Sequence, residues 1–110
     1  MRYISLIRDP STTAGNDGGR DLQVTELFNG PFRRILEVRL QNGAVLKRHH
    51  AAEPITVYCV SGTGVFKAGT DLDDEQRLEA GTLITLDAGI DHEVVAEPDL
   101  TIIVSRFKSN

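Results

Sequence analysis

Apolar and polar side chains alternate with a period of two along most of the chain from residue 21 onward. In residues 35–40, for example, Leu36, Val38 and Leu40 share one face of an extended strand. No stretch of ~10 residues or more keeps the 3.6-residue period of an amphipathic helix. The pattern therefore predicts an all-β fold of short antiparallel strands, closed into a sandwich or barrel.

Turn-forming residues divide this pattern into strands of about five to eight residues. Residues 29–31 mark one turn, Asn42-Gly43 a hairpin, and the acidic run 71–75 a hairpin tip. The sequence Ser-Gly-Thr-Gly at 61–64 predicts a further tight turn between two strands. The predicted strands cover residues 3–7, 22–27, 35–40, 44–49, 55–60, 64–68, 76–79, 82–86, 93–97 and 100–107.

Length and composition indicate a single soluble domain. The 110 residues suffice for one hydrophobic core but not for two, so we expect residues 1–20 to form an N-terminal arm and loop and residues 21–107 the barrel. No apolar run approaches the ~18–20 residues that span a bilayer, and no secretion signal is evident, which predicts a cytoplasmic protein without a membrane partner. A net charge of −4 with 5% aromatic residues argues against a nucleic-acid partner.

Two predicted strands, 55–60 and 100–104, are apolar on both faces. A strand in an antiparallel sheet that buries only one face alternates apolar and polar side chains. We therefore expect the second face of these strands to be covered as well, by the opposite sheet on one side and by a partner subunit on the other. This predicts a homodimer.

A block of glycine and histidine residues lies in the first half of the chain. Gly43 is followed after five residues by His49, and Gly62 stands thirteen positions beyond that histidine. This spacing resembles the first motif of the cupin superfamily, G-x5-H-x-H-x3,4-E-x6-G. The second histidine position of that motif falls on Ala51, and its glutamate position falls on Ile55.

A second block lies in the last third of the chain. Gly81, with Gly89 eight residues later and His92 three residues further, resembles the second cupin motif, G-x5-P-x-G-x2-H-x3-N. Asp87 stands at the proline position and Ala96 at the asparagine position. Together the two blocks imply a cupin fold, which is an all-β antiparallel double-stranded β-helix, or jelly-roll barrel.

The resemblance also implies a metal centre that is incomplete in this chain. Cupins with a full site hold iron, manganese, nickel or zinc through three histidines and one carboxylate, and only His49 and His92 remain from that set. A divalent ion needs about four to six donors. We therefore expect a weakly bound divalent metal, with no metal at all as the equal alternative. Asp87 and Asp91, which flank the loop before His92, are candidates to orient its imidazole.

Two further side chains near the first motif could add donors to such a site. Strand alternation places Lys47 on the same inward face as His49 and turns His50 outward, unless a bulge at residues 49–51 reverses it. Glu53 lies two residues before the expected carboxylate position. His50 and Glu53 are therefore possible additional metal ligands.

The two motifs and the strand alternation predict a ligand pocket inside the barrel. Lys47 would supply charge at its mouth, whereas Cys59, the only cysteine, is expected to be a small buried apolar residue rather than a reactive thiol. The residues expected to line the pocket with the two histidines are Val45, Lys47, Ile55, Val57, Cys59 and Val94.

Three functions are compatible with such a chain. The first is a small cupin that binds a small molecule in the barrel and has an incomplete or weak metal site. The second is a metal-dependent cupin enzyme, similar to a dioxygenase or an isomerase, in which His50 or Glu53 completes the coordination. The third is a structural or regulatory cupin without catalysis. A fold does not fix a reaction, so the sequence leaves these alternatives open.

Overall fold

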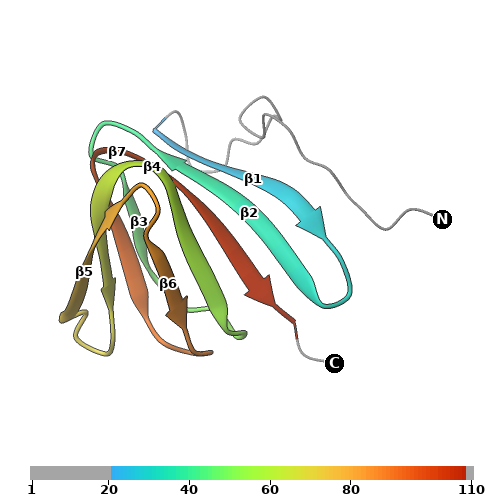
Figure 1. Cartoon of the computed structure of the whole chain (residues 1–110). Helices are drawn as coiled ribbons and strands as arrows, with labels where there is room; N and C mark the ends of the chain where they lie inside the picture. The colour runs from blue at the N-terminus through green and yellow to red at the C-terminus, as the bar shows by residue number, and fades with distance from the viewer. Residues whose placement is uncertain (1–20, 109–110) are drawn as a thin grey trace.

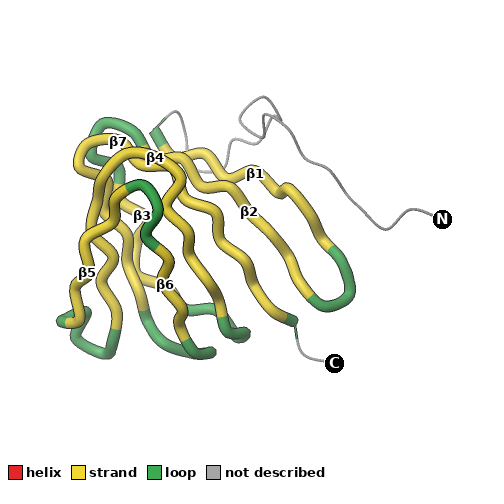
Figure 2. Tube along the Cα trace, viewed as in Figure 1, coloured by secondary structure: helices red, strands yellow, loops and turns green. Residues whose placement is uncertain are grey.

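The computed structural model describes residues 21–108, which form seven β-strands and no helix (Figures 1 and 2). Within this range no helix is therefore long and apolar enough to cross a membrane. All strand pairs are antiparallel, which confirms the predicted fold class. The predicted strand 3–7 and the loop that follows it lie outside the described residues. The strands are β1 (Leu22–Asn29), β2 (Arg33–Leu40), β3 (Val45–His49), β4 (Ile55–Ala68), β5 (Asp74–Glu79), β6 (Leu83–Leu86) and β7 (His92–Phe107).

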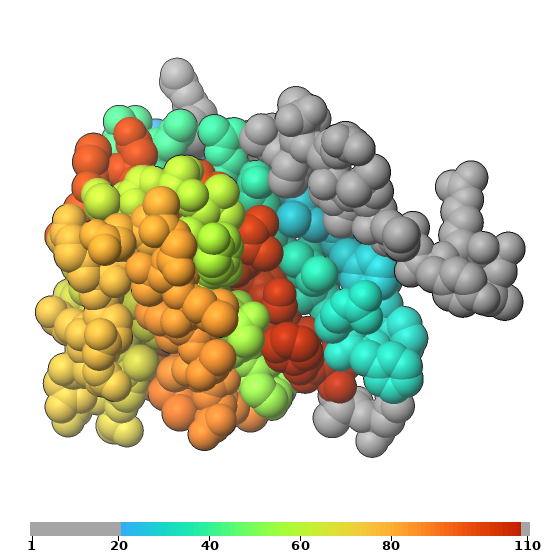
Figure 3. Space-filling model, viewed as in Figure 1, coloured from blue at the N-terminus to red at the C-terminus, as the bar shows by residue number. Residues whose placement is uncertain are grey.

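The two longest strands, β4 and β7, each pass through two sheets and pair with each other in both. Residues 55–62 of β4 and 100–107 of β7 belong to one sheet, with the order β1-β2-β7-β4-β6. Residues 64–68 of β4 and 92–96 of β7 belong to the other, with the order β3-β7-β4-β5. In the space-filling view, the last part of β7 (red) lies between β4 (green) and β2 (cyan) (Figure 3). The two sheets thus cover each other as in a jelly roll.

The strand β4 continues through residues 61–64, where the sequence predicts a tight turn. Its pairing with β7 shifts register twice between Cys59 and Gly64, so this segment is a bulged bend in one strand. Gly62 has a φ of +83°, and a Cβ at this position would lie 2.1 Å from the backbone oxygen of Asp99. The predicted turn is therefore wrong, because these glycines allow two bending strands to approach closely rather than reverse the chain.

The strand β7 likewise joins two predicted strands, 93–97 and 100–107, into one. It bends at residues 97–99, beside the bend of β4, and then runs back toward the end of the barrel where it began (Figure 1). Its first and last residues consequently lie at the same end of the molecule, opposite the bends.

The hydrophobic core lies between the two sheets. Along β4 every second side chain points into it: Ile55, Val57 and Cys59 are at most 4% exposed. Each such side chain contributes about 1.5–3 kcal/mol through burial, so the period-two pattern holds the sheets together. The buried apolar residues are Val38, Leu40, Ile55, Val57, Cys59, Phe66, Ala68, Leu78, Val94, Ala96, Leu100 and Ile102.

Candidate functional site

A cavity of about 150 Å³ opens between the two sheets at the end of the barrel opposite the bends. Its walls are largely apolar, and its polar groups come from three histidines and one arginine. We call it the histidine cavity. It is lined by Val24, Leu36, Val38, Leu46, His49, His50, Ala51, Ile55, His92, Val104 and Arg106.

One histidine from each sequence motif contributes to this cavity. His49, the last residue of β3, pairs directly with His92, the first residue of β7. Their ring centroids are 4.2 Å apart in an edge-to-face arrangement, with an interplanar angle of 61°. On its other side the His92 ring stacks on buried Phe66, at 5.6 Å and 12°. The fold thus holds two imidazoles, 43 residues apart in sequence, in fixed contact.

Backbone carbonyls orient both rings in the same way. Nδ1 of His49 lies 2.8 Å from the carbonyl oxygen of Lys47, and Nδ1 of His92 lies 3.0 Å from that of Ile90. Because a carbonyl oxygen only accepts hydrogen bonds, each Nδ1 carries the hydrogen and donates it. In the neutral rings the free lone pair is therefore on Nε2. Each histidine can accept a hydrogen bond or coordinate a metal through that atom.

His92 is also held in its uncharged form. Its side chain is buried, with 4% of the residue exposed. Burial lowers the pKa of His92 below the usual value, and the nearby His49 acts in the same direction, while the hydrogen bond to Ile90 opposes it. At neutral pH this ring is therefore an acceptor and not a cation.

A bulge in β3 decides which of its residues face the cavity. Leu46 pairs with Val94 and His49 with His92, so β3 uses one more residue than β7 between these two pairs. Leu46 and the exposed His49 therefore both line the cavity, whereas Lys47, which is also exposed, does not. The expectation that Lys47 shares the inward face of His49 is wrong, because strand alternation does not continue through a bulge.

His50 is exposed and lines the cavity where it opens to solvent. Its Nδ1 lies 3.3 Å from Asp91 Oδ1, and Arg48 donates to the other oxygen of that carboxylate from Nη2 and Nε at 2.6 and 3.0 Å. The hydrogen bond from Arg48 lowers the pKa of Asp91. Asp91 therefore contacts His50, whereas the expected orienting contact to His92 is made by the Ile90 carbonyl.

Glu53 faces a cation rather than the two central histidines. Its Oε1 lies 3.0 Å from Nη2 of Arg106, which is on β7 and lines the cavity. The Nε atom of Arg106 is buried and has no hydrogen-bond partner in the part of the chain that the structure describes. Sequence reasoning missed Arg106, although it shares strand parity with the inward residues Ile102 and Val104 and so carried a detectable signal.

Of the remaining residues expected in the pocket, half-buried Val45 does not line the cavity. The other four occupy two positions. Ile55 lines the histidine cavity, whereas Val57, Cys59 and Val94 are at most 1% exposed and belong to the packed core next to it. The Cys59 thiol contacts the Ser61 carbonyl oxygen at 3.6 Å, and burial raises the pKa of this thiol. It therefore stays protonated and unreactive at neutral pH.

The donor set falls short of a closed metal centre. Among residues 21–108 no group of three or more His, Cys, Asp or Glu side chains is placed to hold one ion. A structural zinc site has about four protein ligands and a catalytic one about three. His49 and His92 offer two, and the carboxylates of Glu53 and Asp91 are engaged by arginines.

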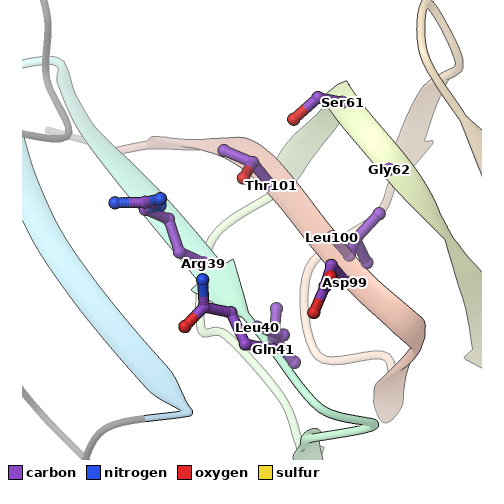
Figure 4. Close-up of a pocket in the computed structure, with 8 residues that line it drawn as sticks. All are labelled: Arg39, Leu40, Gln41, Ser61, Gly62, Asp99, Leu100 and Thr101. Atoms are coloured by element: carbon purple, nitrogen blue, oxygen red, sulfur yellow. The ribbon is translucent and has the colours of Figure 1, made fainter.

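A second depression, of about 240 Å³, lies at the bends of β4 and β7. Figure 4 shows that the guanidinium of Arg39 points away from Ser61 and Thr101, so its polar groups do not converge. Asp99 Oδ1 already accepts a hydrogen bond from the backbone of Asn42, at 3.1 Å. We call this the bend depression and assign it no ligand. It is lined by Arg39, Leu40, Gln41, Ser61, Gly62, Asp99, Leu100 and Thr101.

Solved structures share this arrangement of strands. An RmlC-like cupin from Shewanella frigidimarina superposes with a TM-score of 0.77 at 19% identity, covering 100% of this chain and 96% of that one. The chain has the cupin fold. KdgF from Halomonas sp. gives a TM-score of 0.80 at 20% identity, covering 98% and 96% of the two chains. A variant of oxalate decarboxylase from Bacillus subtilis gives 0.79 at 15% identity, covering 98% of this chain but 31% of that enzyme.

Comparisons by sequence add nothing to this result, because no family model and no curated protein matches the chain. The cupin neighbours differ in what they are named for, and the identities are 20% or less. The likeness establishes the fold, and the function has to be argued from the cavity itself.

Proposed function

We propose that this chain binds a small molecule in the histidine cavity. The observation that carries the proposal is the paired orientation of His49 and His92, whose Nδ1 atoms are used by backbone carbonyls so that Nε2 of each ring can accept a hydrogen bond. An apolar wall with a few oriented polar groups is the usual form of a ligand site. A cavity of about 150 Å³ accepts a molecule of roughly the size of benzene.

A direct test is NMR observation of the imidazole resonances during titration with a panel of small hydroxylated and carbonyl compounds. We expect at least one compound to shift the signals of His49 and His92 together. Replacement by His49→Ala or His92→Ala should weaken binding of that compound by about tenfold or more. A Gln41→Ala variant in the bend depression is the matched control and should bind as the wild type does. Failure of every compound in the panel to shift either imidazole would contradict the proposal.

The second candidate is a divalent ion, such as zinc, nickel, manganese or iron, held weakly by the same two histidines. The Nδ1 contacts to carbonyl oxygens favour it, since metal-bound histidines usually donate their other ring nitrogen in this way. Water would have to fill the remaining positions. Metal analysis of purified protein separates the candidates: a stoichiometric metal that is lost in both His49→Ala and His92→Ala supports the metal site and, with it, a metal-dependent enzyme.

We further propose that the chain forms a homodimer through the outer face of the sheet that contains β6. Tyr58 lies directly between Leu83 and Ile103 on neighbouring strands, and Tyr58 and Leu83 are 44% and 61% exposed. Light scattering should give twice the chain mass, and Tyr58→Asp should shift the protein to a monomer. Phe32→Asp, which changes an exposed aromatic in the β1–β2 turn, is the control. A wild-type monomer at high concentration would refute this.

We also propose a cytoplasmic location and no nucleic-acid partner. The net charge of −4 opposes binding to a phosphate backbone, and the single cysteine leaves no pair for an internal disulfide. Cell fractionation tests the location, and a gel-shift experiment at low salt tests nucleic-acid binding, with no retardation expected.

A further inference from the structure

Among residues 21–108, Arg106 is the one permanently charged group in the wall of the histidine cavity. It lies on β7 next to the inward-facing Val104 and opposite Ile55 of β4. Its guanidinium reaches Glu53 through Nη2, at 3.0 Å, and this contact involves one oxygen of the carboxylate. Nε, in contrast, is buried, so it lies behind the cavity surface, and it has no acceptor among residues 21–108.

An unpaired guanidinium N–H in such a place is an unusual feature. Buried polar hydrogens are nearly always paired, and the guanidinium cannot lose its proton to avoid the cost. The other carboxylate near the cavity, Asp91, is bound by Arg48 and His50. Glu37 is also buried, and its Oε1 likewise has no partner among these residues, but it alternates with Leu36 and Val38 and so lies on the opposite face of β2. No protein acceptor within residues 21–108 satisfies Nε.

On the basis of the proposed small-molecule function, we propose that the ligand is a small hydroxycarboxylate whose carboxylate binds Arg106. Arginine is the side chain best shaped for a planar carboxylate, since its N–H groups can donate two parallel hydrogen bonds. The hydroxyl of the same ligand would donate to Nε2 of His49 or His92, the acceptors left by the backbone contacts. The cavity volume limits the ligand to a molecule of a few heavy atoms.

Glu53 plays a defined part in this scheme. Because it shares the guanidinium with the ligand, its negative charge competes with the incoming carboxylate. Removing that charge with the isosteric Glu53→Gln should strengthen carboxylate binding, whereas removing the positive charge with Arg106→Met should weaken it. Two substitutions within one ion pair are thus expected to change affinity in opposite directions. If the ion pair only stabilised the fold, both substitutions would instead change the affinity for the ligand in the same direction.

The experiment compares glycolate with glycolamide by calorimetry or NMR titration. The two probes have the same hydroxyl and nearly the same size, but only glycolate is charged. We expect the wild type to prefer glycolate by about tenfold or more. Arg106→Met should lose that preference, because it should weaken glycolate binding far more than glycolamide binding, and Glu53→Gln should bind glycolate several-fold more tightly. Arg77→Met, which breaks the exposed ion pair between Arg77 on β5 and Glu97 on β7, is the matched control and should not change either affinity.

The outcomes distinguish this inference from the proposed function. Equal affinity of the wild type for both probes, an unchanged preference in Arg106→Met, or no glycolate binding with a dissociation constant below ~10 mM overturns the carboxylate assignment. The proposed function survives those results if neutral compounds still shift the two imidazoles. It fails separately if binding persists in His49→Ala and His92→Ala. Thermal unfolding of each variant checks that a lost affinity is not a lost fold.

Discussion

The histidine cavity and the bend depression lie at opposite ends of the barrel, but their polar groups differ in burial and in the partners that they already have. In the bend depression the polar side chains are exposed or half-buried, and Asp99 is already hydrogen-bonded to the backbone of Asn42. In the histidine cavity Nε2 of buried His92 and of exposed His49 can each accept a hydrogen bond, and Nε of Arg106 in the wall has no acceptor among residues 21–108. The larger hollow is thus the poorer candidate, because unmet hydrogen-bonding capacity, more than volume, marks a ligand site.

The largest expected effect concerns the bend itself. Gly62→Ala should destabilise the protein by about 3 kcal/mol or more, because its Cβ would lie 2.1 Å from the Asp99 backbone oxygen at a φ of +83°. Gly81→Ala is the control: its φ is +93°, but nothing lies within 4 Å, so about 1 kcal/mol is expected. Denaturant unfolding measures both. Similar losses in the two variants would show that the bend tolerates a side chain and that close strand contact does not define it.

The second prediction tests whether glycolate binds in the histidine cavity or in the bend depression. His92→Gln should reduce glycolate affinity about tenfold or more, since it removes the imidazole acceptor and its contact with His49. Ser61→Ala in the bend depression should leave the affinity unchanged. Calorimetry on both variants checks this. A loss on Ser61→Ala comparable with that on His92→Gln would place the ligand at the wrong end of the barrel for our proposal.

A smaller effect is expected from pH. The folded pKa of His92 lies below its unfolded value of about 6.5, so the unfolded chain binds the proton more readily. The stability from the neutral ring is fully present above about pH 6.5 and declines as pH falls through that value toward the folded pKa. His49, His50 and Asp91 are the titratable groups that face the ring. Unfolding free energies across this range should fall less steeply in His92→Gln, and identical slopes would contradict the assignment.

The smallest effect is expected at the surface. Arg77→Met breaks an ion pair with Glu97 in which the two side chains are 60% and 47% exposed. Solvent screening limits such a pair to about 0.5 kcal/mol. Thermal unfolding should therefore give nearly the wild-type midpoint, and ligand binding should not change. A large loss of stability or of affinity would mean that β5 supports the histidine cavity, although no residue of β5 lines it.

Much of the fold was predictable from the sequence because burial imposes a period of two on most of the two longest strands, β4 and β7. The wrong predictions concern positions where this alternation is interrupted. The glycines at 61–64 carry the local signal of a turn, and only the contact with Asp99, distant in sequence, makes the segment a bend. The bulge between Leu46 and His49 has no local signature, so strand alternation placed Lys47 on the wrong face. At the site, the two histidines followed from motif spacing, whereas Arg106 lay outside any motif and was overlooked.

His92 and Arg106 stand at opposite ends of one strand, yet both reach the same cavity, because β7 folds over at residues 97–99. The distance between His92 and Arg106 across the cavity is therefore expected to depend on the angle of this bend, which lies at the other end of the barrel. A substitution at residues 97–99 is expected to increase or decrease that distance without contacting the ligand. Selection for ligands of a new size can thus act on residues that no map of ligand contacts would include.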